Sequence, residues 1–211
     1  MPGRRELRKQ RTRSGLLKAA MTLFRDRGLQ ATRIADITDL ADVGKGVFYN
    51  YFPTKEALVA ELVRDALESL EREFLMTLDS ALTLEQRVEQ LALLHEKFFE
   101  QHPDYALLIH QGRGLLLLGG APNQPLHDAF RDYLTRLSRW LPPPAERPAW
   151  KHEDLLEAAA AVAGAVAGYR SFRSAAGLDG TSTVGRVLSA GVPRLLEARR
   201  LSAVPPAGKG A

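Results

Sequence analysis

Apolar residues recur along most of the chain at intervals of three and four, the spacing that places them on one face of an α-helix. Glycine- and proline-rich segments, chiefly 119–125 and 142–144, interrupt this pattern. No segment shows the alternation of apolar and polar residues that predicts a β-strand. We therefore predict an all-α protein whose longer helices cover residues 14–27, 55–80, 84–101, 104–118, 126–141, 152–176 and 183–201.

Two shorter helical patterns lie between the first two of these helices. Ile34, Ile37 and Ala41 share one face of the first pattern, and Thr32 can cap its N-terminus. The turn 42–44 then leads into the second pattern, which ends at residue 52. Two short helices joined by a tight turn form a helix-turn-helix unit, whose second helix enters the major groove of DNA.

The second pattern is rich in aromatic residues: four of the five residues from 48 to 52 are Phe or Tyr, in a chain that is 7% aromatic overall. Its apolar members recur at helical spacing and can fill a small core. This leaves Lys45, Tyr49 and Asn50 pointing away from that core. These three side chains suit hydrogen bonds to phosphates and base edges. The alternative interpretation is a surface turn that happens to be aromatic.

A longer series of residues surrounds this unit. In order, it consists of Leu16, Ala19, Ala20, Leu23, Phe24, Gly28, Ala31, Thr32, Ile37, Val43, Gly46, Phe48, Tyr49, Tyr51, Phe52, Lys55, Glu56 and Leu58. The series resembles the tetracycline-repressor (TetR-like) family of transcription regulators. The resemblance implies an N-terminal three-helix DNA-binding domain followed by a larger helical domain that binds a ligand and dimerises. It also implies DNA contacts from Thr32, Arg33, Lys45, Gly46, Val47, Tyr49, Asn50, Tyr51 and Lys55.

Three residues depart from the family's usual pattern. Thr38 stands where alanine is usual, which places a hydroxyl at a tightly packed position. Asp42 stands where glycine is usual, in a turn that needs the left-handed backbone conformation, which Asp tolerates better than most residues. Gly44 replaces a capping serine, at a cost of roughly a few tenths of a kcal/mol. None of the three changes removes a DNA-facing group.

Positive charge is concentrated at the N-terminal end. Residues 1–55 contain 12 Lys and Arg against five Asp and Glu, a net charge of +7, whereas the remaining residues carry a net charge of −3. A basic N-terminal quarter on a mildly acidic body is expected of a DNA-binding protein. We therefore divide the chain into a flexible basic arm (1–13), a helix-turn-helix domain (14–54), a helical effector-binding and dimerisation domain (55–203) and a disordered tail (204–211).

Two helix ends carry clear sequence signals. Gly28 is suited to close the helix that begins at about Ser14. Thr54, after Pro53, can cap the long helix that begins at Lys55. The resemblance implies that this long helix connects the DNA-binding domain to the body, and that Lys55 contacts a DNA phosphate.

The last two predicted helices carry a second informative feature. Residues 155–167 are apolar on nearly every side of the helix, which predicts burial on several sides. By the resemblance, these two helices pair with their symmetry mates in a homodimer; the alternative is a core within one chain. A kink is expected at Pro193. The candidate interface residues are Leu155, Ala159, Val162, Val166, Val184, Leu188, Gly191 and Leu195.

Polar and aromatic residues are scattered among the apolar helices of the body. The resemblance implies an effector pocket there, for an unknown small molecule that is apolar or aromatic. Each residue taken singly is equally compatible with a core position or a solvated edge. The candidates are Phe98, Phe99, Tyr105, His110, Gln111, Arg113, Trp140, Tyr169, Phe172 and Arg173.

Other classes of protein find little support. Without cysteine the chain forms no disulfide and no cysteine-ligated zinc site. The five histidines lack zinc-ligand spacing, and neither a complete phosphate loop nor a Gly-x-Ser-x-Gly motif is present. We expect no cofactor, no metal and no enzymatic activity. The most apolar run, 155–168, is too short to span a membrane, and no apolar segment follows the basic start, which favours the cytoplasm.

The pattern, the charge and the resemblance together predict a homodimeric DNA-binding transcription regulator. We expect it to be a repressor that a small-molecule effector releases from an inverted-repeat operator. The alternative is a structural or adaptor DNA-binding protein that has no effector.

Overall fold

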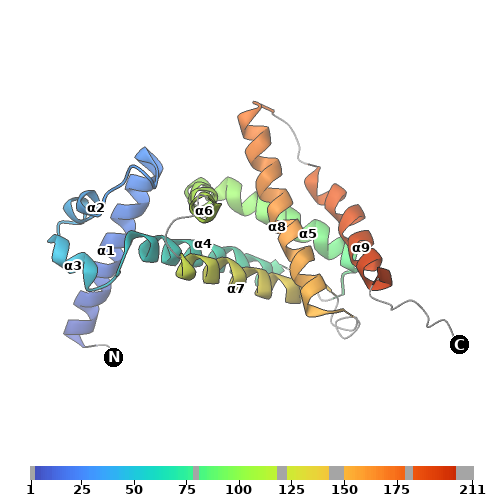
Figure 1. Ribbon diagram of the computed structural model, residues 1–211, viewed down its shortest axis with the longest axis horizontal. Helices are drawn as coiled ribbons and strands as arrows, with labels where there is room; N and C mark the ends of the chain where they lie inside the picture. The colour runs from blue at the N-terminus through green and yellow to red at the C-terminus, as the bar shows by residue number, and fades with distance from the viewer. Residues whose placement is uncertain (1–2, 78–80, 118–122, 143–149, 179–182, 203–211) are drawn as a thin grey trace, which may run out of the picture. The chain divides into compact units, whose positions relative to one another are not determined.

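The computed structural model describes residues 3–77, 81–117, 123–142, 150–178 and 183–202. Within these ranges the regular structure is helical throughout, which confirms the predicted all-α class (Figure 1). The helices are α1 (Arg4–Arg27), α2 (Ile34–Leu40), α3 (Lys45–Tyr49), α4 (Lys55–Thr77), α5 (Leu84–Gln101), α6 (Pro103–Leu117), α7 (Gln124–Trp140), α8 (His152–Ala175) and α9 (Val184–Ser202).

The chain divides into two compact units. The first consists of Met1–Glu68 and His102–Phe130, and the second of Ser69–Gln101 and Arg131–Ala211. Helices α4 and α7 therefore contribute to both units. The first unit contains the predicted DNA-binding segment 14–54 together with α6, so α6 is part of the surroundings of the candidate interface.

Helix α1 begins at Arg4 rather than at about Ser14, so the predicted flexible arm is wrong for residues 4–13. Most of these residues are strong helix formers, and neither Gly nor Pro occurs among them. Glu6 in the first turn also complements the helix dipole. At the other end, the backbone of Gly28 adopts φ +80°, and its N–H donates to the carbonyl of Phe24 at 3.0 Å. The predicted C-cap is confirmed.

The remaining boundaries differ little from the sequence-based ones. Helix α5 has the predicted range, and α6 begins one residue early, at Pro103, because proline suits the first turn of a helix. Helix α7 starts at Gln124 rather than at residue 126. Pro193 lies inside α9. The predicted helix ends at 80 and 118 and the predicted tail at 204–211 lie outside the described residues.

The first unit packs α1 against the helix-turn-helix segment. Leu16 and Leu23 of α1 are buried, as are Ile37 of α2 and Phe48 of α3. Helix α6 approaches closely through Gly112, where an added Cβ would lie 3.2 Å from a methyl carbon of Val63 in α4. Glycine at this position therefore sets how near α6 comes to α4.

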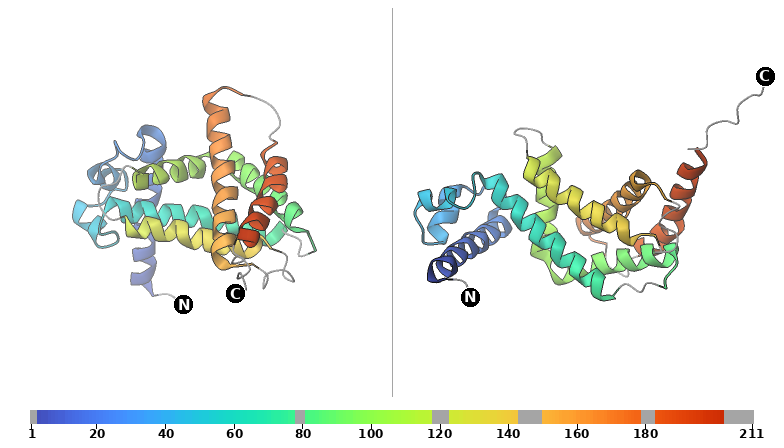
Figure 2. Two further views of the ribbon diagram at one scale, coloured as in Figure 1. Left: turned by 45° about the vertical axis from the view of Figure 1, so that its right-hand side comes forward. Right: turned by 90° about the horizontal axis from the view of Figure 1, so that it is seen from below.

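In the second unit, α5, α8 and α9 pack against one another (Figure 2). Ala92, Val166 and Val184 form a fully buried cluster, with Tyr169 and Leu188 against it. Helix α9 comes close to α5 at Gly185, where an added Cβ would lie 3.3 Å from the carbonyl oxygen of Glu89.

This packing corrects most of the predicted dimer interface. Side chains with almost no exposed area in one chain cannot bury more area against a partner. The residues to which this applies are Leu155, Ala159, Val162, Val166 and Val184. They belong to the core of a single chain, which was the alternative interpretation. Leu188 is half-buried, and Gly191 and Leu195 are exposed, so their place in a dimer interface stays a prediction.

Candidate nucleic-acid interface

The turn between α2 and α3 has the geometry of a helix-turn-helix. Asp42 adopts φ +52°, as predicted for a residue that stands in place of glycine. The N–H of Val43 then donates to the carbonyl of Thr38 at 3.0 Å, which closes the turn. Thr38 is buried, and its hydroxyl donates to the carbonyl of Ala35 at 2.9 Å. The extra hydroxyl is therefore satisfied inside its own helix.

Helix α3 is short and is held by one aromatic anchor. The Phe48 ring is fully buried and lies 5.5 Å from the Tyr49 ring and 5.7 Å from the Phe52 ring, measured between centroids. Burying Phe48 turns the opposite side of α3 to solvent, which leaves Lys45 and Asn50 exposed. The predicted exposed row is thus present, while Val47 and Tyr51 are half-buried.

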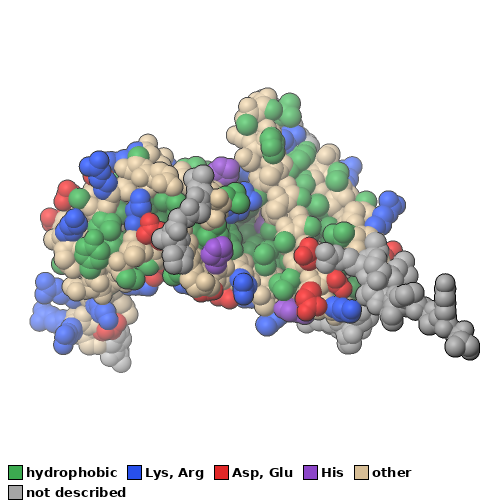
Figure 3. Space-filling model, viewed as in Figure 1, with side chains coloured by type: hydrophobic (Ala, Val, Ile, Leu, Met, Phe, Trp, Pro, Cys, Tyr) green, Lys and Arg blue, Asp and Glu red, His purple; other side chains and the backbone are tan. Residues whose placement is uncertain are grey.

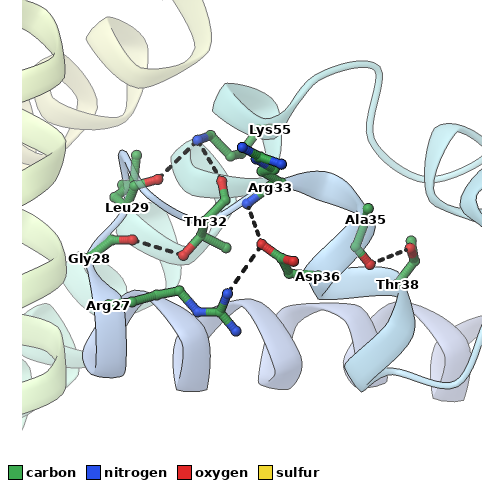
Figure 4. Close-up of polar contacts among 9 residues, drawn as sticks. All are labelled: Arg27, Gly28, Leu29, Thr32, Arg33, Ala35, Asp36, Thr38 and Lys55. Atoms are coloured by element: carbon green, nitrogen blue, oxygen red, sulfur yellow. Dashed lines mark hydrogen bonds and ion pairs between the residues drawn. The ribbon is translucent and has the colours of Figure 1, made fainter.

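The segment that joins α1 to α2, residues 28–33 and here called the α1–α2 turn, is held by side chains (Figure 4). The hydroxyl of Thr32 donates to the carbonyl of Gly28 at 2.8 Å. The N–H of Arg33 donates to the carboxylate of Asp36 at 3.0 Å, and Asp36 also pairs with Arg27 at 3.4 Å. Backbone groups outside a helix need such partners, and here Asp36 of α2 and Thr32 of the turn itself supply two of them, while Arg27 of α1 pairs with the Asp36 carboxylate.

One prediction for Thr32, its role as N-cap, is therefore wrong, and its DNA contact stays a prediction for its backbone only. The N-cap of α2 is Arg33, not Thr32. The Thr32 side chain is buried, and its only hydrogen donor is used within the turn, so the hydroxyl does not face DNA. The next residue, Arg33, is exposed.

Lys55, the first residue of α4, braces the same turn. Its ammonium donates to the carbonyls of Leu29 and Thr32, both at 2.9 Å (Figure 4). An ammonium has three N–H groups, so one remains for a further acceptor. The predicted cap of α4 is present, since the Thr54 hydroxyl accepts the N–H of Ala57 at 3.1 Å.

A shallow hollow of about 400 Å³ opens where α2, α3 and α4 meet. It brings together four of the predicted DNA-binding positions: Thr32, Arg33, Tyr49 and Lys55. Tyr49 is half exposed at one wall. Glu56 also lines the hollow, but Arg33, Lys55 and Tyr49 are residue types that bind phosphates.

The N-terminal part of α1 adds positive charge to this unit. Figure 3 shows Lys and Arg side chains gathered around it, and Arg4, Arg5, Arg8, Lys9 and Arg11 are all exposed. Arg13 marks where this segment meets the rest of the unit: it pairs with Glu61 of α4 and lies 5.6 Å from the centroid of the Phe52 ring. Burial raises the pKa of the Glu61 carboxyl, and Arg13 opposes that rise.

The ten predicted pocket residues are divided between the two units. Tyr105, His110, Gln111 and Arg113 lie in the first unit, and the others lie in the second. Phe172 is 80% exposed, which contradicts a pocket-lining role in the single chain. The side-chain oxygen of Gln111 accepts the N–H of Leu29 at 2.9 Å, so this residue contacts the α1–α2 turn.

The other predicted pocket residues have varied surroundings. His110 is exposed, while Phe98 and Phe99 are packed in the core with their ring centroids 5.7 Å apart. Arg173 lies over the Tyr169 ring. Tyr105 stacks near His102, and the carbonyl of Trp140 accepts a hydrogen bond from Arg87. In Arg113, the Nε atom is buried and has no hydrogen-bond partner within the described chain.

Sequence reasoning did not find the buried polar groups of the second unit. His95 is fully buried, and its Nδ1 lies 2.6 Å from the carbonyl of Leu91, which can only accept, so Nδ1 carries the proton. Nε2 then accepts the hydroxyl of Tyr133. Burial lowers the pKa of His95 to about 4 and raises that of Tyr133. The sequence did contain a signal for these groups: His95, like the buried Arg87, is a polar residue within the apolar stripe of α5.

A buried anchor in α3, an exposed polar row beside it, and a basic surface around both define a helix-turn-helix DNA-binding domain. Comparison with known proteins identifies its kind. The family of bacterial regulatory proteins called tetR matches residues 16–62. These residues therefore form a DNA-binding domain of the tetR family, as the resemblance implied.

Curated relatives match over part of their length. The HTH-type transcriptional repressor KstR2 of Mycolicibacterium smegmatis is 38% identical over 101 residues, which are 47% of this chain and 48% of that protein. KstR2 of Rhodococcus jostii is 44% identical over 80 residues, 36% and 39% of the two chains. The repressor NicS of Pseudomonas putida is 30% identical over 116 residues, 52% and 54% of the two chains. The match thus spans about half of these relatives or less.

Solved structures extend the likeness to the whole fold. GusR of Salmonella enterica superimposes with a TM-score of 0.67 at 20% identity, over 88% of this chain and 95% of that one. The flavonoid-responsive regulator FrrA gives 0.59 at 25% identity, over 90% and 97%. FadR of Bacillus subtilis, solved with stearoyl-CoA, gives 0.62 at 15% identity, over 87% and 97%. The chain therefore has the fold of TetR-type regulators beyond the matched domain.

Proposed function

We propose that this protein is a homodimeric transcriptional repressor that binds an inverted-repeat operator and is released from it by a small molecule. The observation that carries the proposal is the exposed row on α3, Lys45, Tyr49 and Asn50, within a domain of the tetR family. The matched curated relatives are named as repressors, which supports the sign of regulation. No observation favours the alternative of a structural or adaptor protein without an effector.

The candidate DNA-binding residues of the first unit divide into those on or beside α3 and those beside the hollow. Lys45, Tyr49 and the half-buried Tyr51 contact phosphates or base edges, and Asn50 reads a base edge in the major groove. Val47 is placed to touch a thymine methyl, and Gly46 permits close approach of the backbone. Arg33 and the remaining N–H of Lys55 bind phosphates beside the hollow. Thr32 contributes only through its backbone, because its hydroxyl is used within the turn.

The exposed start of α1 adds further phosphate contacts. Its five basic residues, Arg4 to Arg11, are accompanied by only one acid, Glu6. The segment 4–11 of α1 has no buried residue, so it gains little from packing within the chain. Opposite a DNA backbone, these charges release counterions and strengthen binding to any sequence.

The dimer forms through the faces of α8 and α9 that the single chain leaves uncovered. Helix α8 exposes small residues and then a large apolar one, at Ala160, Gly164 and Phe172. Helix α9 exposes Val187 and Leu195, which are 66% and 42% exposed, on either side of Gly191. Small residues let two helices approach closely, and the exposed apolar groups supply the area to be buried. A two-fold dimer presents two α3 helices, hence the inverted repeat.

The effector is a small organic molecule with an apolar body. Solved relatives are described as flavonoid-responsive or were obtained with stearoyl-CoA, and both descriptions fit that class. Arg113 is the best-supported polar contact, because its buried Nε has no partner in the described chain. A carboxylate or phosphate on the effector would satisfy it. Release requires that the effector bind more tightly to a form of the dimer that fits the operator poorly.

Genomic footprinting of the bound protein tests the central claim. We expect a set of sites that share an inverted repeat, with half-sites roughly one or more helical turns apart. A thermal-shift screen that includes flavonoids and acyl-CoA thioesters then identifies ligands, and each is tested for release of the recovered operator. Sites without a shared repeat would refute operator recognition, whereas ligands that stabilise the protein without weakening operator binding would refute the effector role.

A further inference from the structure

Within the first unit, Gln111 connects helix α6 with the DNA-binding segment. It lies in the second half of α6, and its side-chain oxygen accepts the N–H of Leu29 at 2.9 Å. Residues 29 and 111 are 82 positions apart in sequence. The Leu29 N–H needs such an acceptor, because helix α1 has ended at Gly28 and the backbone there no longer continues the helical hydrogen-bond ladder.

The residue that Gln111 holds is also held by Lys55. While Gln111 binds the N–H of Leu29, the Lys55 ammonium binds its carbonyl, and the same ammonium binds the carbonyl of Thr32. The Leu29 side chain is buried. Leu29 is therefore fixed at both backbone polar groups and at its side chain, and its position determines where the Lys55 ammonium sits.

The ion pair between α6 and α1 is weaker than this hydrogen bond. Asp104 of α6 lies 3.6 Å from Arg25, but both side chains are about half exposed, and exposed ion pairs contribute little. Gln111 makes a directed hydrogen bond to a half-buried group, and such bonds fix positions.

We propose that Gln111 is a positioning residue for DNA binding, which touches no DNA itself. By holding Leu29, it sets the α1–α2 turn, and through the turn the Lys55 ammonium and the adjoining Arg33. A shift of α6 by about an ångström would break the 2.9 Å bond and loosen that phosphate-binding group. This inference rests on the proposed DNA-binding function.

Two substitutions in the full-length chain separate this role from simple packing. Gln111→Met keeps the length of the side chain but removes the acceptor, whereas Gln111→Glu keeps an acceptor for the Leu29 N–H. His110→Ala is the matched control, because His110 is an exposed neighbour on the same helix. The DNA probe is a duplex of roughly 30 base pairs, about three helical turns, that the wild-type protein selects from a random pool.

Three quantities are measured: probe affinity over a salt series, the amide exchange rate of Leu29, and the melting temperature. In Gln111→Met we expect Leu29 exchange to accelerate about tenfold and probe affinity to fall about tenfold, both measured below the melting temperature of the variant. The slope of affinity against salt should not change, because no phosphate contact is removed outright. Gln111→Glu should restore slow exchange and most of the affinity, and His110→Ala should behave as wild type.

Each contrary result has a distinct meaning. A Gln111→Met variant that melts earlier but binds the probe with wild-type affinity would make Gln111 a packing residue and overturn the inference. Unchanged Leu29 exchange in that variant would refute the hydrogen bond. If the wild-type protein selects no sequence from the pool, the proposed DNA-binding function is refuted. This result depends on the wild-type protein alone, so it is separate from any result on the Gln111 variants.

Discussion

Replacing Lys55 with methionine removes the ammonium but keeps most of the aliphatic stem. In the free protein the ammonium donates to the carbonyls of Leu29 and Thr32 at 2.9 Å each. Hydrogen bonds to a charged group contribute about 1.5–3 kcal/mol each when buried, and less where water can take over. Because Lys55 is half-buried, we expect a combined loss of about 2 kcal/mol in the free energy of unfolding.

By the proposed function, the same substitution also removes one phosphate contact per protomer. Each lost contact makes the dependence of log affinity on log salt shallower by about 0.9, so a dimer should lose about 1.8. Binding should weaken on specific and non-specific DNA alike, since phosphates carry no sequence information. Lys55 thus acts both on stability and on salt dependence, and the two effects are measured separately.

Urea denaturation gives the stability, and fluorescence anisotropy over a salt series gives the slope. Arg8→Ala is the matched control, because Arg8 is an exposed basic residue on the start of α1. We expect it to make the salt slope shallower without changing stability. If Lys55→Met had the stability of the wild type, the stabilising role of its hydrogen bonds to Leu29 and Thr32 would be refuted. If it had the salt slope of the wild type, Lys55 would not belong to the DNA interface.

Three further predictions concern the body and its packing. Burial lowers the pKa of His95 to about 4. Between pH 7 and 5 the unfolded chain therefore takes up a proton that the folded chain excludes, and the free energy of unfolding should fall by about 2 kcal/mol. In urea denaturation at both pH values, the free energy of unfolding of His95→Gln should fall by about 2 kcal/mol less than that of the wild type. Gly112→Ala should destabilise the fold by about 1 kcal/mol, because the new Cβ would lie 3.2 Å from a methyl carbon of α4. Gly114→Ala should stabilise the fold, because nothing lies within 4 Å of the new Cβ. If thermal unfolding ranked the two variants in the opposite order, this packing would be contradicted. Phe172→Glu should give a folded monomer in sedimentation, whereas Val166→Glu, in the core of one chain, should not fold; a dimeric Phe172→Glu protein would refute the proposed interface.

The elements that sequence predicted well depend on local information. A helical period, a glycine after the last turn and an aspartate at a left-handed position each act within a few residues. Gly28 and Asp42 accordingly have the predicted positive φ values. The start of α1 was wrong because charge was interpreted as disorder, although Arg, Lys and Gln also favour helices.

The predicted dimer interface shows where a periodic pattern is ambiguous. Helix α8 is apolar nearly all round, so the pattern shows that several sides are buried but not what covers each side. Val162 and Val166 pack inside the chain, and so do the small residues Ala158 and Ala159, whereas Ala160, Gly164 and the large Phe172 are exposed. Neither hydrophobicity nor residue size separates the two sets. What covers each side follows only from the packing of α5 and α9 against α8, which a periodic pattern does not contain.

The α1–α2 turn explains why polar residues were the hardest to assign. Backbone groups outside a helix must find partners, and in a short turn those partners are side chains from elsewhere in the chain. Here they come from α2, α4 and α6, through Asp36, Lys55 and Gln111. From sequence alone, the last two have the same appearance as a DNA contact and a ligand contact. The turn needs Lys55 and Gln111 whether or not DNA or an effector is bound. Substitutions at these positions should therefore alter protein stability as well as function. An experiment that measures only DNA affinity would attribute both effects to contact with DNA.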